Sequence, residues 1–325
     1  MNIVEIPALI DMHVHLREPG YECKETIETG LNAAYKGGFG AVCAMPNTKP
    51  VCDNVQTLNY ILNKAKDSKC TLYQVCAITK NLDSNEPVDF ETLKNAGAIA
   101  FSNDGLPVLN HQVFYNALKT ENLILSHCED ETKEVKWQSE IFEELVREGH
   151  SPRLHFCHIS KKSSLDIIKS AKSRGLKITC ESAPHYFTFT KENVTDSGVF
   201  KMNPPLGSTE DKKAVIEAIK DGTIDVIATD HAPHDTEEKL LPYSHAPNGI
   251  TGLETAFSLT YEVFGLERTI ELMSQNPQKI LGIENNKKVK FDLDARWTVR
   301  GAEFESKCKV TPYENMQLKG VRIND

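Results

Sequence analysis

Residues 9–20 read LIDMHVHLREPG, an apolar run that ends in two histidines one residue apart and is followed by an arginine and a Pro-Gly pair. Such a run has the composition of a buried strand, and the Pro-Gly pair predicts a turn directly after it. His13 and His15 have the same parity along this strand, so their side chains are expected on one face, about 7 Å apart along the chain and able to converge on one ion. The stretch therefore predicts a strand whose end carries polar chemistry.

Eight runs of this kind recur along the chain, and together they predict the fold. They read ALIDMHVH, FGAVCAMPN, LYQVCAIT, AIAFSND, LILSHCE, RLHFCHIS, LKITCESAP and DVIATDHAP, with amphipathic helical patterns such as KSSLDIIKSAKSRG between them. Continuous apolar strands that alternate with amphipathic helices indicate a parallel sheet covered by helices. Eight such units over about 230 residues predict an α/β fold of the TIM type, a (β/α)8 barrel. No G-x-G-x-x-G motif follows any run, which argues against an open dinucleotide-binding sheet.

The C-terminal part of the chain has a different pattern. A helical pattern continues after Gly265 to about Leu281, and beyond it only short strand-like pieces occur, namely WTVRG, KCKVTP and QLKGVRIN. We therefore expect a catalytic barrel over residues 1–282 and a short C-terminal extension over residues 283–325 that packs on the barrel.

Composition and charge limit the class of protein. The 325 residues are 40% hydrophobic and 26% charged, which is typical of a globular protein with a large core. A net charge of −9 without a basic cluster argues against nucleic acid as a partner. No apolar segment approaches the roughly 20 residues that span a bilayer, and Met1 is not followed by a signal-peptide pattern, so we expect a cytoplasmic protein without membrane contact. Nine cysteines, an odd number without a C-x-x-C pair, predict reduced residues in the core.

Polar residues end six of the eight predicted strands, and in barrel enzymes the chemistry gathers at such ends. These residues are His13 and His15 on the first strand, Asn47 on the second, Asp104 on the fourth, His127 on the fifth, His158 on the sixth and Asp230 on the eighth. A single histidine at a strand end is more often a satisfied polar residue than a metal ligand, and a barrel without a site is the plain alternative. Four histidines and two aspartates on five strands favour a metal centre.

The donor types indicate which ions would suit this centre. Imidazole nitrogens with carboxylate oxygens and no thiolate suit zinc or a similar divalent ion in an open catalytic site. Six donors exceed what one tetrahedral zinc takes, so a two-metal centre would use them all. Asp104 is then the natural bridge, because its two oxygens can bind one ion each. One zinc ion or two per subunit stay open as alternatives.

Two strands offer a choice between neighbouring polar residues. On the sixth strand, His155 and His158 have opposite parity and are not expected to face the axis together. His158 lies at the C-terminal end and is the predicted ligand, which leaves His155 a structural role. On the eighth strand, Asp230 shares the parity of the apolar positions before it, so His231 is expected to point away from the axis, toward packing or an outer hydrogen bond.

These segments are similar to those of dihydroorotases, specifically the bacterial type I group of the amidohydrolase superfamily. The matching segments lie between residues 11 and 255 and read DMHVHLREPG, AMPNTKP, AFSNDG, LSHCED, FCHIS, KMNPPL, ATDHAPH and GITGLET. Carried over position by position, the resemblance implies a first metal held by His13, His15 and Asp230, a bridging Asp104, and a second metal held by His127 and His158. It also implies contacts to the substrate: from Arg17, Asn47 and His234 to its carboxylate, and from Asn203 to its ring, with a loop over residues 247–252 closing beside it.

The activity implied by the resemblance is the zinc-dependent, reversible cyclisation of N-carbamoyl-L-aspartate to (S)-dihydroorotate with loss of water, the third step of de novo pyrimidine (UMP) biosynthesis. Under this hypothesis a metal-bridging hydroxide attacks the ring amide carbonyl, and Asp230 shuttles the proton to the leaving nitrogen. Arg17 suits a carboxylate because its guanidinium can bind both oxygens at once. The resemblance leaves open whether the protein forms a homodimer or associates with aspartate carbamoyltransferase.

Three departures from the family pattern are visible. The His13-x-His15 pair comes almost at the start of the chain, so the N-terminal strands that normally form a β-sandwich with the C-terminus are expected to be missing. The segment LGIENNKKVKFDLDARWTV is shorter than usual, and Gly207 stands where an arginine is common.

Two other functions compete with this hypothesis. A hydantoinase- or allantoinase-like cyclic amide hydrolase typically bridges its metals with a carboxylated lysine at the end of the fourth strand, where this chain has AIAFSND without a lysine. A non-catalytic dihydroorotase-like subunit that scaffolds aspartate carbamoyltransferase typically has degraded ligand histidines, whereas all six ligand positions are present here.

Overall fold

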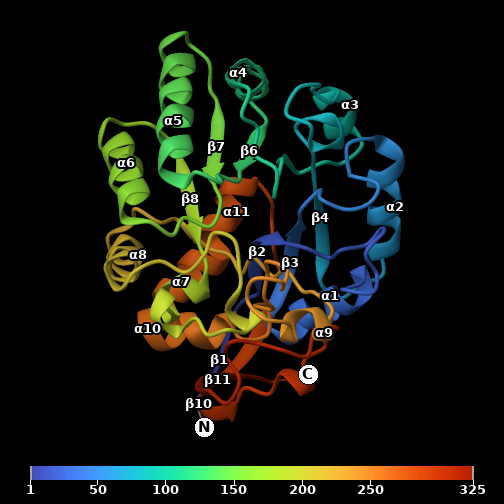
Figure 1. Cartoon of the computed structure of the whole chain (residues 1–325), viewed down its shortest axis with the longest axis vertical. Coiled ribbons are helices and arrows are strands. Elements are labelled where there is room, and N and C mark those ends of the chain that lie inside the picture. The colour runs from blue at the N-terminus through green and yellow to red at the C-terminus, as the bar shows by residue number, and fades with distance from the viewer. Residues whose placement is uncertain (1, 324–325) are drawn as a thin grey trace.

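Eight parallel strands form a barrel in the computed structural model of the chain, which describes residues 2–323 (Figure 1). Strands that follow one another in sequence are neighbours in the sheet, and a parallel bridge between Val14 and His231 brings the last strand to the first. The predicted (β/α)8 barrel is confirmed. The strands are β2 (Leu9–Val14), β3 (Phe39–Ala44), β4 (Thr71–Cys76), β5 (Ala100–Phe101), β6 (Leu123–Ser126), β7 (Arg153–Phe156), β8 (Thr179–Ser182) and β9 (Val226–Ile227).

Helices cover the outside of the barrel and connect its strands (Figure 1). In α1 (Ile27–Lys36) the side chain of Thr26 caps the N-terminus, and Ile27 and Leu31 are buried on the face that packs against β3. The other helices are α2 (Val55–Ala65), α3 (Phe90–Asn95), α4 (His111–Lys119), α5 (Glu131–Arg147), α6 (Lys162–Ser173), α7 (Pro184–Thr188), α8 (Thr209–Asp221), α9 (Thr236–Leu240), α10 (Ala256–Ile270) and α11 (Asn276–Leu281). Shorter turns are η1 (Lys80–Leu82), η2 (Lys191–Asn193), η3 (Gly198–Phe200), the π-helical η4 (Glu271–Gln275) and η5 (Gly301–Glu303).

In β2, the first strand of the barrel, the alternation of inward- and outward-pointing side chains is interrupted where the site begins. Met12 packs with Cys43 in the apolar cluster formed by the barrel strands, yet the next residue, His13, also points inward. Neighbouring strand residues normally point to opposite faces. The register of β2 against β3 shifts between Asp11 and Val14, and such an irregularity re-aims a side chain. The strand therefore presents a polar ligand directly above its apolar part.

A second, antiparallel sheet joins the two ends of the chain. Its strands are β1 (Ile3–Pro7), β10 (Lys288–Thr298) and β11 (Gln317–Ile323), in the order β1-β10-β11. The expectation that the N-terminal strands are missing is wrong for β1, which pairs with β10 along its whole length. Phe291 of β10 stacks on Phe257 of α10 with 3.6 Å between ring centroids, and this contact attaches the small sheet to the barrel.

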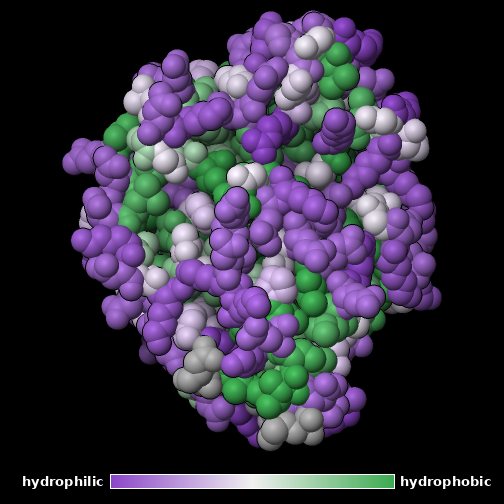
Figure 2. All heavy atoms as spheres, turned by 180° about the vertical axis from the view of Figure 1, so that it is seen from behind, coloured by the Kyte–Doolittle hydropathy of each residue, from purple (hydrophilic) through white to green (hydrophobic). Residues whose placement is uncertain are grey.

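The surface and the cysteines agree with a globular core. All nine cysteines are free thiols, and Cys23 alone among them is exposed. Within residues 2–323 no helix has the length and apolar character needed to cross a membrane. Hydrophilic side chains cover most of the face in Figure 2, and an apolar patch lies near the end of the molecule that carries the small sheet.

Candidate active site and metal centre

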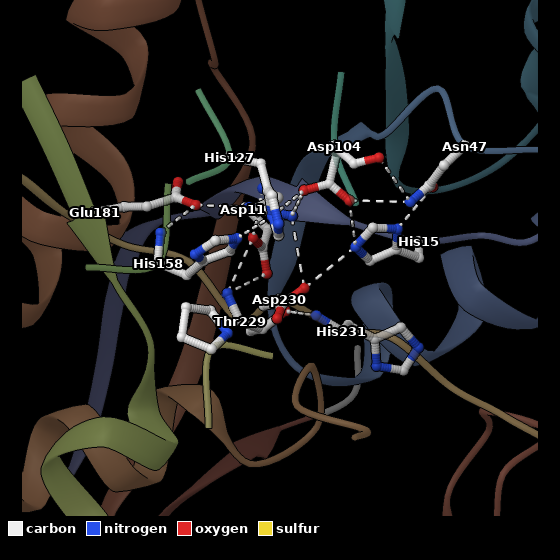
Figure 3. Close-up of polar contacts among 12 residues, drawn as sticks. Asp11, His15, Asn47, Asp104, His127, His158, Glu181, Thr229, Asp230 and His231 are labelled. Carbon is white, nitrogen blue, oxygen red and sulfur yellow. Dashed lines mark hydrogen bonds and ion pairs between the residues drawn. The ribbon is translucent and has the colours of Figure 1, made fainter. Parts of the chain in front are cut away.

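The six predicted metal ligands come together at the C-terminal end of the barrel strands, and Figure 3 labels all of them except His13. All six are buried. They are His13 in β2 and His15 just after it, Asp104 after β5, His127 after β6, His158 after β7 and Asp230 after β9. Because parallel strands end at the same edge of the barrel, residues far apart in sequence become direct neighbours.

Two aspartates lie among the imidazoles. Asp104 faces three histidines: its Oδ1 is 3.2 Å from Nε2 of His13 and 3.4 Å from Nδ1 of His127, and its Oδ2 is 3.5 Å from Nε2 of His15. Oδ1 of Asp230 is 3.2 Å from Nε2 of His15 and 3.5 Å from Nε2 of His13. The two oxygens of Asp104 thus face different imidazoles, as a bridging carboxylate requires.

Hydrogen bonds fix the orientation of the first two histidines. Nδ1 of His13 donates to Oε1 of Glu181 at 2.7 Å, and Nδ1 of His15 donates to Oδ1 of Asn47 at 2.9 Å. An imidazole whose Nδ1–H is used in this way can present the lone pair of Nε2 to a cation. Figure 3 shows His15 directed at the space between the two aspartates.

The cluster has unsatisfied atoms that a cation would bind. Among residues 2–323, Nε2 of His13, Nδ1 of His158 and Oδ1 of Asp104 are buried without a hydrogen-bond partner, which is uncommon for buried polar atoms. Two sets of donor atoms each lie within 4.8 Å of one another, one from His13, His15 and Asp230 and one from His13, Asp104 and His158. These residues fit one or two divalent cations that prefer nitrogen and oxygen donors.

A third set of donor atoms, from His13, Cys157 and Glu181, fits a metal less well. Burial raises the pKa of the Cys157 thiol far above its ordinary value, whereas a metal ligand has to be the thiolate. Glu181 is already occupied by hydrogen bonds to His13 and His155. The ion would therefore sit among imidazoles and carboxylates.

The two aspartates and His158 are held in the protonation states that bind metal. Burial alone would raise the pKa of Asp230, but His13 and His15 lower it to about 2. Burial opposes ionisation of Asp104 as well, and the same two histidines hold its pKa well below the ordinary value. Burial, together with the neighbouring charge of His127, lowers the pKa of His158 to about 3. Ionised carboxylates and a neutral imidazole are the forms that bind metal.

Glu181 in β8 is a site residue that the sequence analysis missed. It connects His13 to His155, whose Nε2 lies 3.1 Å from Oε2 of Glu181. The expectation that His155 and His158 cannot both face the axis is therefore wrong. His158 lies beyond the end of β7 with a φ of 35°, and this left-handed backbone turns its side chain back into the site. An acidic residue within the apolar run LKITCESAP is the signal that identifies Glu181 in the sequence.

Asp11 is a second residue that the sequence analysis missed. Its carboxylate is buried in β2 and accepts hydrogen bonds from the backbone N–H groups of His13 at 3.0 Å and Thr229 at 3.2 Å. It thereby ties the backbone beside two ligands, His13 and Asp230. Burial raises the pKa of Asp11 to about 7.

The six predicted metal ligands together form what we call the metal cluster. His231 points away from this cluster, as its parity predicts (Figure 3). Its Nε2 lies 3.4 Å from Oε2 of Glu25, and its Nδ1 accepts a hydrogen bond of 3.2 Å from the backbone N–H of Gly252. Oε2 of Glu25 also accepts a 2.5 Å hydrogen bond from Oγ of Ser306. This network links the C-terminal segment to the residue that follows Asp230.

A cavity of about 160 Å³ opens beside the metal cluster. Three of the predicted substrate-binding residues, Arg17, Asn47 and Asn203, line it together with Asn248 and Gly249. Arg17 donates from Nε to the carbonyl oxygen of Pro233 at 3.0 Å, and its backbone has a left-handed φ of 63°. A guanidinium on one side and a metal cluster on the other can hold a small molecule that carries a carboxylate.

The fourth predicted substrate contact, His234, stands behind the Arg17 guanidinium and not on the cavity wall. Its Nε2 is 3.2 Å from Nη2 of Arg17 and donates to the carbonyl oxygen of Asn248 at 2.6 Å. Its Nδ1 accepts from Nζ of Lys24 at 3.1 Å. Both ring nitrogens of His234 thus have protein partners.

The two asparagines are each tied to the metal cluster. Asn47 donates from Nδ2 to Oδ2 of Asp104 at 2.9 Å. Asn203 donates from Nδ2 to Oε2 of Glu129 at 2.9 Å, and this oxygen lies 3.5 Å from Nε2 of His127. The cavity and the cluster are therefore one continuous site.

A larger hollow lies at the opposite end of the barrel, where β6, β7 and β8 begin. Its volume is about 590 Å³. The part of the chain that the structure describes places no set of three metal-ligating side chains there. Five of the six predicted metal ligands, His15, Asp104, His127, His158 and Asp230, line the smaller cavity.

Comparisons with known proteins identify the family to which this chain is similar. A family model described as Dihydro-orotase-like matches residues 3–164. The dihydroorotase of Desulforapulum autotrophicum is 40% identical over 97% of this chain and 83% of its own length, and the dihydroorotase of Acetivibrio thermocellus is 39% identical over 97% and 84%. The dihydroorotase of Listeria innocua is 40% identical over 94% of this chain and 82% of its own length.

Solved structures share the fold at lower sequence identity. L-hydantoinase from Arthrobacter aurescens superimposes with a TM-score of 0.85 and 22% identity over 98% of this chain and 83% of that chain. D-hydantoinase from Thermus sp. gives a TM-score of 0.80 and 22% identity over 99% and 83%. At this identity the likeness concerns the barrel architecture.

Proposed function

The chain belongs to the dihydroorotase family, and from this premise we propose that it catalyses the zinc-dependent, reversible cyclisation of N-carbamoyl-L-aspartate to (S)-dihydroorotate, the third step of de novo pyrimidine biosynthesis. The observation that carries the proposal is the position of Arg17, which lines the same small cavity as the histidine and aspartate cluster. A substrate with a carboxylate and a reacting amide needs both features within one site.

We assign the metal ligands in two groups. His13, His15 and Asp230 would hold one ion, His127 and His158 a second, and Asp104 would bridge them. When bound, the ions supply an acidified water as the nucleophile and polarise the amide carbonyl. Glu181 and Asn47 orient His13 and His15 through their outer nitrogens, which keeps the ligating nitrogens directed at the ions.

Asp230 is the residue that would move the proton. It is ionised at neutral pH because of the imidazoles beside it, and it lines the cavity in which the ring would lie. In the hydrolytic direction its carboxylate accepts the proton of the attacking water and then donates it to the leaving ring nitrogen. In cyclisation the same two transfers run in reverse.

Arg17 would bind the substrate carboxylate through its planar guanidinium. The carbonyl oxygen of Pro233 accepts from Nε of Arg17 and so fixes the orientation of the guanidinium toward the cavity, and the imidazole of His234 packs behind it. Asn203 is placed on the wall of the cavity, where its amide can contact the ring. The ring would therefore lie between Arg17 and the metal cluster.

Assay of the purified chain tests this proposal. The protein is loaded with zinc, its metal content is measured, and hydrolysis of (S)-dihydroorotate is compared with that of hydantoin and allantoin. We expect turnover of dihydroorotate that disappears on chelation and returns with zinc. Bound zinc without turnover would support a non-catalytic subunit, and a preference for hydantoin or allantoin would support another cyclic amide hydrolase.

A further inference from the structure

Lys239 in α9 is a buried cation outside the metal cluster. Only 2% of its surface is exposed, and it forms no ion pair with any carboxylate of residues 2–323. Lysine is rarely buried without a charged partner, because its ammonium group loses hydration. Its position in this fold therefore calls for a specific role.

The ammonium group of Lys239 connects two separate loops. Its Nζ donates to the carbonyl oxygen of Lys201 at 2.9 Å and to that of Pro247 at 3.0 Å. The carbonyl oxygen of Lys201 also accepts a hydrogen bond of 3.0 Å from the backbone N–H of Gly249. Two carbonyl oxygens, one from each loop, thus bind this single side chain, and the Gly249 N–H connects the two loops directly.

Both loops form the wall of the substrate cavity. Asn203, Asn248 and Gly249 line the cavity. Lys201 lies two residues before Asn203, and Pro247 directly precedes Asn248. The carbonyl oxygen of Asn248 accepts a hydrogen bond from His234, the residue that lies behind Arg17. A displacement of either loop would move cavity-lining groups.

The C-terminal segment binds the chain on both sides of the buried Lys239. Thr236 at the start of α9 accepts a hydrogen bond of 3.1 Å from the backbone N–H of Lys309, and Thr251 donates to the carbonyl oxygen of Val310 at 3.4 Å. A buried amine in such a place cannot exchange its partners for bulk water. The carbonyl oxygens would be left unpaired if the ammonium group were removed.

We propose that Lys239 is a positioning residue for the substrate side of the site. Its ammonium group holds the loops that carry Asn203 and Asn248 against each other, and so fixes the cavity wall opposite the metal cluster without touching the substrate. The inference rests on the proposed function only for the identity of the substrate. The arrangement of the loops is independent of it.

The test uses the full chain with two substitutions. Lys239→Met keeps an unbranched side chain that is one atom shorter, and it removes the donors. Lys172→Met is the matched control, because Lys172 donates to the carbonyl oxygen of Thr223 at 2.7 Å and to Asp225 at 2.6 Å, just before β9 at the other end of the barrel. Both variants lose a lysine that is bonded to a backbone carbonyl, but only Lys239 binds the loops that line the cavity.

Two measurements on these proteins decide the question. With dihydroorotate as substrate, we expect Lys239→Met to raise KM by about ten- to a hundredfold at unchanged zinc content, with kcat within about threefold of the parent, and Lys172→Met to leave both constants unchanged. Without substrate, hydrogen exchange over residues 198–203 and 245–252 should become at least about tenfold faster in Lys239→Met only, with the amide of Gly249 as the most direct reporter.

The outcomes separate this inference from the proposed function. If the parent protein does not turn over dihydroorotate, the proposed function fails, and the exchange measurement still decides the role of Lys239. Unchanged exchange in both loops, or an unchanged KM in an active enzyme, would overturn the inference. If Lys239→Met does not fold, Lys239→Gln, whose shorter, uncharged side chain cannot serve both carbonyl oxygens as the ammonium group does, is judged by the same two criteria.

Discussion

The metal half and the substrate half of the site are built in different ways. The metal ligands lie in or just after barrel strands and are oriented by side chains of other strand ends, such as Glu181 on His13 and Asn47 on His15. The substrate half consists of loops whose groups are held by backbone carbonyls, as Arg17 is by Pro233. Strands place the reactive groups rigidly, whereas loops determine which molecule can reach them.

Left-handed backbone occurs in both halves. The φ angles are 35° at His158, 48° at Asp230 and 63° at Arg17. Non-glycine residues in this region cost about 1–3 kcal/mol each, and such residues cluster at active sites. In both halves the extended backbone is interrupted at a residue whose side chain lines the cavity.

Removal of the proton carrier should break the metal half most completely. Asp230→Asn keeps the size of the side chain but removes the charge and the ability to accept a proton, so we expect kcat to fall by about 10²–10⁴-fold. Steady-state hydrolysis of dihydroorotate measures the effect, and circular dichroism checks that the fold is retained. Activity near that of the parent protein would refute the role of Asp230.

Loss of an outer contact should weaken the metal half without removing a ligand. Glu181→Gln replaces the carboxylate that accepts from Nδ1 of His13, and we expect zinc affinity to fall by about 10–100-fold. Competition with a chelator measures this affinity independently of turnover. An unchanged zinc affinity would show that Glu181 does not orient His13.

A substitution in the substrate half should separate binding from chemistry. Arg17→Lys keeps the charge and loses the planar pair of donors, so we expect KM to rise by about tenfold with little change in kcat or zinc content. The Michaelis parameters for dihydroorotate provide the readout. A fall in kcat at constant KM would place Arg17 in the chemical step instead.

A substitution at the N-terminal end of the barrel strands should change neither KM nor kcat. Nζ of Lys287 donates to the carbonyl oxygens of Gly40 at 3.2 Å and Lys69 at 2.8 Å, near the beginning of β3 and β4. For Lys287→Met we expect the free energy of unfolding to fall by about 1 kcal/mol, with unchanged KM and kcat. Denaturant unfolding and the standard assay check the two parts, and altered kinetics would contradict the separation between the barrel ends.

The metal half could be predicted from the sequence, because a strand end follows an apolar run and parity sets the direction of a side chain. Only the expectation that His155 and His158 cannot both face the axis was wrong, since a left-handed turn after β7 is not visible in a strand pattern. Glu181 was missed because its partner His13 lies 168 positions away.

Long-range contacts also explain the other omissions. Strand β1 is short, and its partner β10 begins at Lys288, so nothing local in IVEIP identifies it as part of a sheet. Lys239 binds carbonyl groups 38 and 8 positions away. Every residue has a backbone carbonyl, so the residue types in the sequence do not indicate these contacts. Loop architecture becomes visible only when the fold brings such segments together.

Anomalous scattering at the zinc edge, from a crystal of the zinc-loaded protein with bound dihydroorotate, tests the division of the site most directly. We predict a metal peak among His13, His15, Asp104 and Asp230, and the ring carboxylate within hydrogen-bonding distance of the Arg17 guanidinium. Zinc bound elsewhere, or a carboxylate directed away from Arg17, would contradict the assignment of the two halves.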